Sequence, residues 1–473
     1  MAFDVDIVVL SNIEKNLGPD IECRVGAPNS NPWSLPFAHK KVFSDNVANY
    51  DVFVYSEDDI LITERNLRAF LKASELLPSD EIAGFLRVEF GSDRELNYPD
   101  VHAHFHWDPS SVKRHGEYTL AHFTNEHAAS YVLTRNQLRR ALDSGKFDVG
   151  PHEGKYDLPC SAATDPYTQC GLKKLIPISH LDEFTVHHMS NRYVGSMGVS
   201  ADGFDRQINV LMGIANGALR TPRSQFSAET RLFRATYSKD YYEPVMEQIA
   251  SRIPSSARNV LSIGCGSGRT ESWLAQQGLR VAAIPLDPVI ASSATASGIE
   301  IISEDIEGAD PSRGDRFDCV LCLNILHLVR EPTKLLLISS DFMQRGATLV
   351  IQSPNMMSLR GLRSLLRGGR STFLTDYETA GTHFSSAAAI RRWCTSSGLK
   401  VDGMSRILAN RDDGRLGMAS TICRYLPASL SSMAATSILA SASKPYTDGR
   451  HNPEVHRIED VVSLGTARGG EPA

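Results

Sequence analysis

Three glycines at alternate positions, Gly264, Gly266 and Gly268, follow an apolar run that begins at Val260. Because glycine carries no side chain, a turn built from it lets a ligand lie against the backbone. Residues 269–277, which follow the turn, are expected to form a helix. A buried strand that leads through a glycine turn into a helix is typical of nucleotide sites, so this segment predicts binding of a nucleoside-like ligand.

An acidic residue stands about 20 residues further on, a separation that is usual in dinucleotide-binding units. It is Asp287, and it ends the apolar run of residues 279–286. A carboxylate at the tip of a strand can accept the hydrogens of both ribose hydroxyls. The glycine turn and Asp287 together predict the first half of a doubly wound nucleotide site.

Further apolar runs continue the alternation of strands and helices. A short run at 299–303 leads to Asp305, the run 317–324 ends in Asn324, and another run covers 348–355. Helices are expected at 243–253, ahead of the first of these strands, and after His383, ending near residue 399. Such alternation predicts a parallel sheet with helices on its faces.

This succession resembles the class I S-adenosylmethionine-dependent methyltransferases, especially those that act on small molecules and surface glycans. The resemblance covers residues 240–446 and implies a Rossmann-like sheet that binds S-adenosyl-L-methionine. It implies that Gly264, Gly266 and Gly268 line the amino-acid end of the cofactor, Asp287 its ribose, Asp305 and Ile306 its adenine, and that Asn324 and His327 face the transferred methyl. In the family the acidic residue ends the second strand directly, whereas here Pro285, which has no backbone donor, precedes Asp287 by two residues.

Methyl transfer from a sulfonium needs little covalent chemistry from the protein, because the methyl group is already activated and alignment supplies most of the effect. A base is required only for some acceptors. For a sugar hydroxyl, His327 or His383 can take the proton, since imidazole titrates near neutrality. The alternative is that either histidine is a polar residue packed at a strand end.

A second group of charged residues, Glu57, Asp58 and Asp59, interrupts the apolar and aromatic segment 50–62, which is expected to form a buried strand. Adjacent carboxylates within apolar flanks are unfavourable unless a cation neutralises them. A hard divalent ion that bridges a diphosphate would do so. The alternative is a strand end whose acids are solvated.

Residues 1–200 resemble the GT-A type glycosyltransferases, which use nucleotide sugars. The resemblance implies that Glu57, Asp58 and Asp59 hold Mn²⁺ or Mg²⁺, with Asp59 as the direct ligand and His187 or His188 completing the coordination. It also implies a carboxylate base on the acceptor side, for which Asp165, Glu153 and Glu126 are the candidates. Only 56 residues precede the acidic triplet, so the nucleotide-binding segment of the family is shortened here.

The 473 residues, 42% of them hydrophobic, predict two α/β domains of about 200 residues each. The expected division is a GT-A-like domain at 1–200, a linker at 201–239, a methyltransferase domain at 240–446 and a disordered tail at 447–473. A net charge of −6 provides no basic field, which argues against a nucleic-acid partner.

The cysteine pattern and the hydropathy indicate the compartment. Eight cysteines are scattered without the spacing of a disulfide framework, which favours a cytoplasmic protein. The start of the chain has no signal-peptide pattern, and no window has the roughly 18 apolar residues of a spanning helix. Arginines at positions 360, 363, 367 and 370 predict a cationic helical face, which is either solvated or a site of peripheral membrane attachment.

The sequence therefore predicts a bifunctional glycan-modifying enzyme for surface polysaccharide or glycolipid synthesis. One half would add a sugar from a nucleotide-sugar donor to a glycan or glycolipid, and the other would methylate a sugar hydroxyl. One alternative is that the N-terminal half only binds a glycan. Another is that the C-terminal half methylates a small metabolite unrelated to sugars.

Overall fold

The computed structural model describes residues 3–220, 226–304, 306, 309–311, 316–359, 361–362, 376–408 and 434–445. The chain divides into two compact units, Met1–Thr221 (unit 1) and Pro222–Ala473 (unit 2). Asp305, the arginines at 360, 363, 367 and 370, and the tail 447–473 lie outside the described residues. In the part of the chain that the structure describes, no helix is both long and apolar enough to cross a bilayer.

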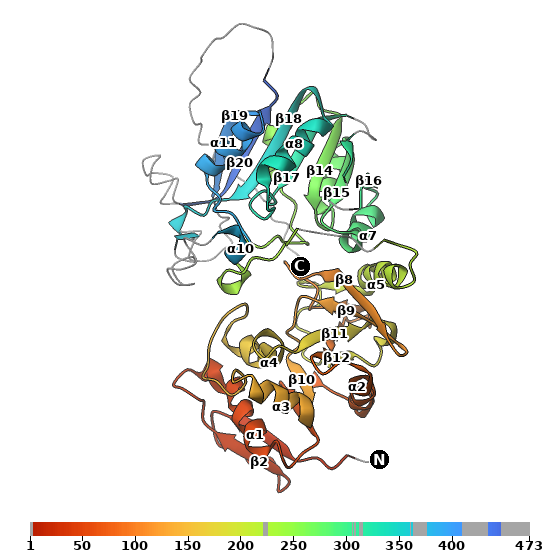
Figure 1. Cartoon of the computed structure of the whole chain (residues 1–473), viewed down its shortest axis with the longest axis vertical. Helices are drawn as coiled ribbons and strands as arrows, with labels where there is room; N and C mark the ends of the chain where they lie inside the picture. The colour runs from red at the N-terminus through yellow and green to blue at the C-terminus, as the bar shows by residue number, and fades with distance from the viewer. Residues whose placement is uncertain are drawn as a thin grey trace, which may run out of the picture. The chain divides into compact units, whose positions relative to one another are not determined.

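Unit 2 is built on one sheet of seven strands in the order β16-β15-β14-β17-β18-β20-β19 (Figure 1). Its strands are β14 (Asn259–Cys265), β15 (Arg280–Pro285), β16 (Glu300–Ile301), β17 (Phe317–Leu323), β18 (Met343–Pro354), β19 (Lys400–Leu408) and β20 (Ala435–Ser443). The first five are parallel, whereas β20 runs antiparallel to both β18 and β19. The chain runs outward from β14 to β16 and then returns to β17 on the other side of β14. This reversal places a topological switch point at the carboxyl ends of β14 and β17, where open α/β sheets bind ligands.

Helices cover both faces of this sheet. They are α6 (Arg269–Gln276), α7 (Pro288–Ala296), α8 (Pro332–Phe342), α10 (Tyr377–Ala380) and α11 (Ala387–Ser396). Adjacent residues of β14 belong to different apolar clusters, Val260 to the one with Leu274 of α6 and Leu261 to the one with Ile390 of α11. The doubly wound architecture expected for the second half is thus confirmed.

The segment ahead of β14 differs from expectation. A helix was expected over residues 243–253, but only a short 3₁₀ turn, η4 (Glu247–Arg252), forms there. Glu243 is instead engaged with Lys239 and Asn324. At the start of this segment, the Glu243 side chain bonds to Asn324 at the end of β17, and the backbone is not helical.

Unit 1 is a mixed α/β unit with several small sheets. Its strands are β1 (Ile7–Ser11), β2 (Ile21–Val25), β3 (Val52–Ser56), β4 (Ile60–Leu61), β5 (Glu81–Ala83), β6 (Leu86–Phe90), β7 (Leu96–Tyr98), β8 (Trp107–His115), β9 (Tyr118–Phe123), β10 (Ser130–Thr134), β11 (Lys173–Pro177), β12 (Thr185–His188) and β13 (Val199–Ser200). The larger sheets have the orders β5-β11-β9-β8 and β13-β7-β6-β12-β4, and β10 pairs with β3. Its helices are α1 (Ala38–Asn46), α2 (Glu64–Leu76), α3 (Arg135–Asp143), α4 (Leu158–Thr168) and α5 (Ala201–Ala215).

Two sequence expectations for unit 1 change. The segment 50–62 is not one strand, because β3 and β4 belong to different sheets and the acidic triplet lies in the turn between them. The region expected as a linker at 201–239 begins with α5, whose Phe204 is fully buried and stacks on Tyr98 with ring centroids 3.7 Å apart. Residues 201–215 therefore pack as part of unit 1.

Candidate functional site

The glycine turn of unit 2 joins β14 to α6, and two of its glycines adopt left-handed conformations. The φ angles are 77° at Gly264 and 83° at Gly268, a region that favours glycine. Gly266 is required for a different reason, because a Cβ placed there would lie 2.2 Å from the carbonyl oxygen of Tyr241. Ser267 donates its backbone N–H to that same oxygen across 2.7 Å. The bare backbone at Gly266 thus accommodates the protein's own chain, and the ligand contacts of the three glycines stay predictions.

A buried chain of polar side chains connects the segment before β14 to the end of β17. The Lys239 side chain is 1% exposed, and its Nζ donates to Glu243 Oε2 across 2.5 Å and to the Leu323 carbonyl across 2.8 Å. Asn324 Nδ2 donates to Glu243 Oε1 across 2.9 Å. Burial raises the pKa of Glu243, against the opposing effect of Lys239. Lys239 and Glu243 also line a small cavity at the glycine turn.

Lys239 and Glu243 were not predicted as site residues from the sequence. A lysine and a glutamate four residues apart usually form a solvated ion pair on a helix surface. Here the pair lies in a non-helical segment against the sheet edge. Tyr241, which lies between them, was a weak sign that this segment is buried, since an aromatic side chain can anchor such a segment to the core.

Asn324 adopts a left-handed conformation with φ of 53° directly after β17. Asparagine tolerates this conformation better than most residues. Its backbone N–H donates to the carbonyl of Gln352 across 2.8 Å, while its side chain reaches Glu243. The structure thus places Asn324 directly after β17, at the switch point, and its approach to the transferred methyl stays a prediction.

Asp287 caps helix α7. Its Oδ1 accepts hydrogen bonds from the backbone N–H groups of Val289 and Ile290 at 2.8 and 2.9 Å. The strand before it ends at Pro285. Ile306 is buried in the apolar core of the sheet. The ribose contact of Asp287 and the adenine contact of Ile306 stay predictions.

His327 and His383 lie close in space but are held differently. His327 Nε2 donates to the Tyr237 carbonyl across 2.9 Å, and His383 Nε2 donates to the Arg330 carbonyl across 3.0 Å. The backbone N–H of His383 donates to the carbonyl of His327. Burial lowers the pKa of His327 to about 4, so it is neutral at physiological pH but a weak base. These contacts favour the interpretation of His327 as a packed polar residue.

Three buried polar atoms at the carboxyl edge of the sheet have no hydrogen-bond partner. They are Ser267 Oγ, His327 Nδ1 and Gln352 Oε1. In the described part of unit 2, all other buried side-chain nitrogen and oxygen atoms have a hydrogen-bond partner. Ser267 follows β14, His327 follows β17, and Gln352 lies near the end of β18. Because an unpaired buried polar atom costs about 1–3 kcal/mol, this edge has groups suited to a polar ligand such as S-adenosylmethionine.

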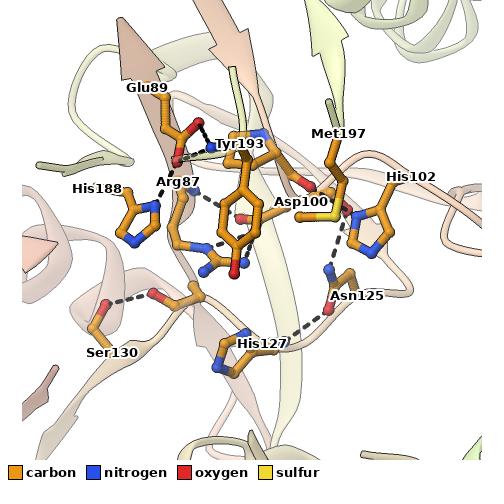
Figure 2. Close-up of polar contacts among 12 residues, drawn as sticks. Arg87, Glu89, Asp100, His102, Asn125, His127, Ser130, His188, Tyr193 and Met197 are labelled. Atoms are coloured by element: carbon orange, nitrogen blue, oxygen red, sulfur yellow. Dashed lines mark hydrogen bonds and ion pairs between the residues drawn. The ribbon is translucent and has the colours of Figure 1, made fainter. Parts of the chain in front are cut away.

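In unit 1, His188 joins two carboxylates, and Figure 2 shows its contact with one of them, Glu89. Its Nδ1 lies 2.6 Å from Glu89 Oε1, and its Nε2 lies 2.9 Å from Asp59 Oδ2. The structure therefore brings together Asp59 and His188, two residues that the sequence assigned to one site, and adds Glu89, which the sequence did not single out.

The other predicted metal ligands lie apart from this pair. Glu57 Oε1 is 3.8 Å from His127 Nε2, Asp58 is exposed, and His187 Nε2 contacts Asn191 Oδ1 at 3.1 Å. The side chains of Glu57 and Asp59 are 36% and 37% exposed, because they lie in a turn. Solvent therefore reaches both carboxylates, and the expectation that they are buried and need a cation to neutralise them is wrong. Within the described residues, no group of three or more His, Cys, Asp or Glu side chains is arranged to hold a metal.

The predicted bases of unit 1 have different surroundings. Asp165 is fully buried in α4 and its Oδ2 pairs with Lys40. Glu126 lies 3.7 Å from Lys155, and Glu153 is exposed. Only Asp165 is thus held in a fixed, buried position.

Comparisons with known proteins agree with the architecture of unit 2. Residues 234–402 match a family model described as a methyltransferase domain. A ubiquinone biosynthesis O-methyltransferase of Xanthomonas axonopodis pv. citri is 24% identical over 173 residues, which are 34% of this chain and 71% of that protein. The same enzyme of Xylella fastidiosa strain M23 is 26% identical over 201 residues, covering 39% of this chain and 79% of its own.

Among solved structures, a possible histamine N-methyltransferase of Thermotoga maritima is similar with 17% identity and a TM-score of 0.31. The match covers 42% of this chain and 86% of that one. The family match, together with the sheet order and the glycine turn, identifies the C-terminal part of the chain. Residues 234–402 form a class I S-adenosylmethionine-dependent methyltransferase domain.

Proposed function

We propose that unit 2 transfers a methyl group from S-adenosylmethionine to a hydroxyl oxygen of a small molecule. The observation that carries this proposal is the set of unpaired buried atoms, Ser267 Oγ, His327 Nδ1 and Gln352 Oε1, at the carboxyl edge of a methyltransferase sheet. The similarity to O-methyltransferases supports an oxygen acceptor.

The residues around the glycine turn would hold the cofactor. Ser267 Oγ can donate to its carboxylate, and Glu243 can accept from its amino group while Lys239 keeps Glu243 in place. When bound, S-adenosylmethionine supplies an activated methyl group, so the protein has mainly to align the acceptor.

The acceptor is best matched by a hydroxyl that ionises readily. His327 Nδ1 is the free nitrogen at the edge, but its pKa of about 4 makes it a weak proton acceptor. A phenol loses its proton far more easily than a sugar hydroxyl does. A small phenolic acceptor therefore fits the described residues better than a sugar.

Titration calorimetry of the full chain with S-adenosylhomocysteine tests the cofactor site. We expect saturable binding that is about tenfold weaker in Ser267→Ala, which corresponds to about 1.4 kcal/mol. Ser251→Ala is the control, because Ser251 Oγ bonds only locally to Gln248 in η4. Folded protein that gives no heat would overturn the proposal. Labelled S-adenosylmethionine offered with catechol and with methyl glucoside tests the acceptor, and we expect label only in catechol.

A second candidate function concerns unit 1, which we propose to bind a divalent cation and to transfer a sugar from a nucleotide-sugar donor. The supporting observation is that Glu89 fixes His188. If Nδ1 donates to Glu89, then Nε2 accepts from Ser190 Oγ at 2.9 Å and also faces Asp59 Oδ2 at 2.9 Å. A cation that takes the place of the Ser190 contact would be held by Nε2 and Asp59, and carboxylate-bound histidines are common metal ligands.

Manganese binding measured by electron paramagnetic resonance tests this candidate. We expect Asp59→Asn to abolish binding and Asp58→Asn to retain it, since Asp58 is exposed. Manganese-dependent hydrolysis of a nucleotide sugar should follow the same order. Glycan binding without either activity would favour the alternative of a non-catalytic module.

A further inference from the structure

Unit 1 contains a polar cavity of about 330 Å³ beside helix α4. A water molecule occupies about 30 Å³ in the liquid, so the cavity is far larger than a site for one structural water. It lies at the lower end of the range for small-molecule sites, roughly 300–1,000 Å³. Its wall includes Glu126, His152, Lys155, Tyr156, Thr164 and Asp165.

Asp165 presents an unsatisfied oxygen in this wall. The residue is 0% exposed, and its Oδ2 is paired with Lys40. Its Oδ1 has no hydrogen-bond partner, although His152 Nε2 lies 3.2 Å away. A buried carboxylate oxygen in that condition is unfavourable unless a donor reaches it. The cavity is the space from which such a donor can come.

The other polar groups of the wall are held in fixed positions. His152 Nδ1 lies 3.1 Å from the Gly150 carbonyl, and Lys155 Nζ donates to the Thr124 carbonyl across 2.7 Å. The ring of Tyr156 is parallel to that of Phe105 within 10°, with centroids 6.0 Å apart. Because these contacts restrain the side chains, the wall needs little rearrangement to accept a ligand.

The mixture of charges selects the class of ligand. An apolar molecule would leave Asp165 Oδ1 without a partner. An anion would be repelled by the carboxylates of Asp165 and Glu126. A cation would be repelled by Lys155, and by Lys40, which is paired with Asp165. A hydroxyl group both donates and accepts, so a molecule with several hydroxyls can pair with all of these groups. We propose that this cavity binds a neutral, hydroxyl-rich small molecule of monosaccharide size, which donates a hydroxyl to Asp165 Oδ1. The proposal is independent of methyl transfer and of the cation site.

Two glycines of the same loop provide a matched pair of variants. Gly154 lines the cavity, whereas Gly150 does not, and a Cβ at either position meets no atom within 4 Å. Gly154→Phe should therefore obstruct the cavity without straining the fold. Gly150→Phe places the same side chain in open space outside the cavity wall.

Saturation-transfer difference NMR on the full chain, with glucose, galactose and myo-inositol as probes, tests the proposal in the presence of EDTA. We expect binding of at least one probe, at least tenfold weaker binding in Gly154→Phe, and unchanged binding in Gly150→Phe. The proposal is overturned if the unmodified chain binds none of the three probes or if the two variants bind them equally. It is also overturned if the chain binds inorganic phosphate in preference to the probes.

His152→Ala gives a second test that does not disturb the buried ion pair. The His152 side chain is 32% exposed, and Asp165 keeps Lys40 as its partner when His152 is removed. We expect weaker probe binding with an unchanged melting temperature. Unchanged probe binding would remove His152 from the recognition wall and contradict the proposed geometry.

Discussion

Asn324 donates from Nδ2 to Glu243 Oε1 across 2.9 Å and so connects the end of β17 to the segment before β14. The two residues are 81 positions apart, and Glu243 is itself paired with Lys239. Three separate segments thus meet at the carboxyl ends of β14 and β17, since the backbone of the glycine turn also bonds to the Tyr241 carbonyl between Lys239 and Glu243. A substitution in any one of these segments should therefore shift the other two.

The conformation and the amide of Asn324 can be tested separately. Asn324→Gly keeps the positive φ but removes the amide, so we expect weaker binding of S-adenosylhomocysteine with little loss of stability. Asn324→Ala removes the amide and also imposes a left-handed conformation on alanine, which costs a further amount of about 1–2 kcal/mol. Urea unfolding and calorimetry on both variants measure the two effects. Equal stabilities would show that the left-handed conformation carries no strain.

The contact between Gly266 and Tyr241 predicts a loss of stability that requires no ligand. A Cβ at residue 266 would lie 2.2 Å from a backbone oxygen, so Gly266→Ala must displace the segment around Tyr241. We expect a loss of about 1–3 kcal/mol, as for other overpacked sites. Gly154→Ala, where a Cβ meets nothing within 4 Å, is the control and should be nearly neutral. Thermal unfolding without ligand compares them, and similar melting temperatures would contradict the packing.

The buried pair of Lys40 and Asp165 should be strongly coupled. Their side chains are 0% and 1% exposed, and burial lowers the pKa of Lys40 against the effect of Asp165. Removing one partner leaves a buried charge, so Asp165→Leu alone should destabilise unit 1 by about 3–5 kcal/mol. The double variant Lys40→Met with Asp165→Leu should recover most of that loss. A double-mutant cycle by urea unfolding decides, and strictly additive effects would disprove the coupling.

Unit 1 should lose stability on mild acidification. Burial lowers the pKa of His39 to about 3, of His104 to about 3 and of His106 to about 4. Below about pH 6.5 the unfolded chain takes up these protons while the folded unit does not, so stability is present above that pH and falls as the pH drops toward 4. Each histidine contributes about 1.4 kcal/mol per pH unit over this window.

Urea unfolding of the full chain at pH 7 and pH 5 measures that loss. His39→Gln should reduce the dependence by one histidine's share, because the variant has no imidazole to protonate in the unfolded state. A folding free energy that is unchanged between pH 7 and pH 5 would contradict this explanation.

The sequence predicted the five parallel strands of the methyltransferase sheet, because they are continuous apolar runs, but it did not predict β19 and β20, which pair antiparallel to each other. The run ending in Asn324 corresponds to β17, Phe317–Leu323, and the run before the glycine turn to β14. It did not reveal the surroundings of the site, since Lys239 and Glu243 look like a surface ion pair until the fold buries them. The acidic triplet was expected to be buried, but it is partly solvated. Its apolar flanks belong to two strands of different sheets, and the triplet lies in the turn between them.

The position of β20 has a consequence for the synthesis of this protein. β20 is inserted between β18 and β19, although it follows both in the chain. While the ribosome is still translating the codons before Ala435, β18 and β19 each present an open hydrogen-bonding edge. Such edges attract other nascent chains, so an unfinished polypeptide is the species most in need of chaperone protection.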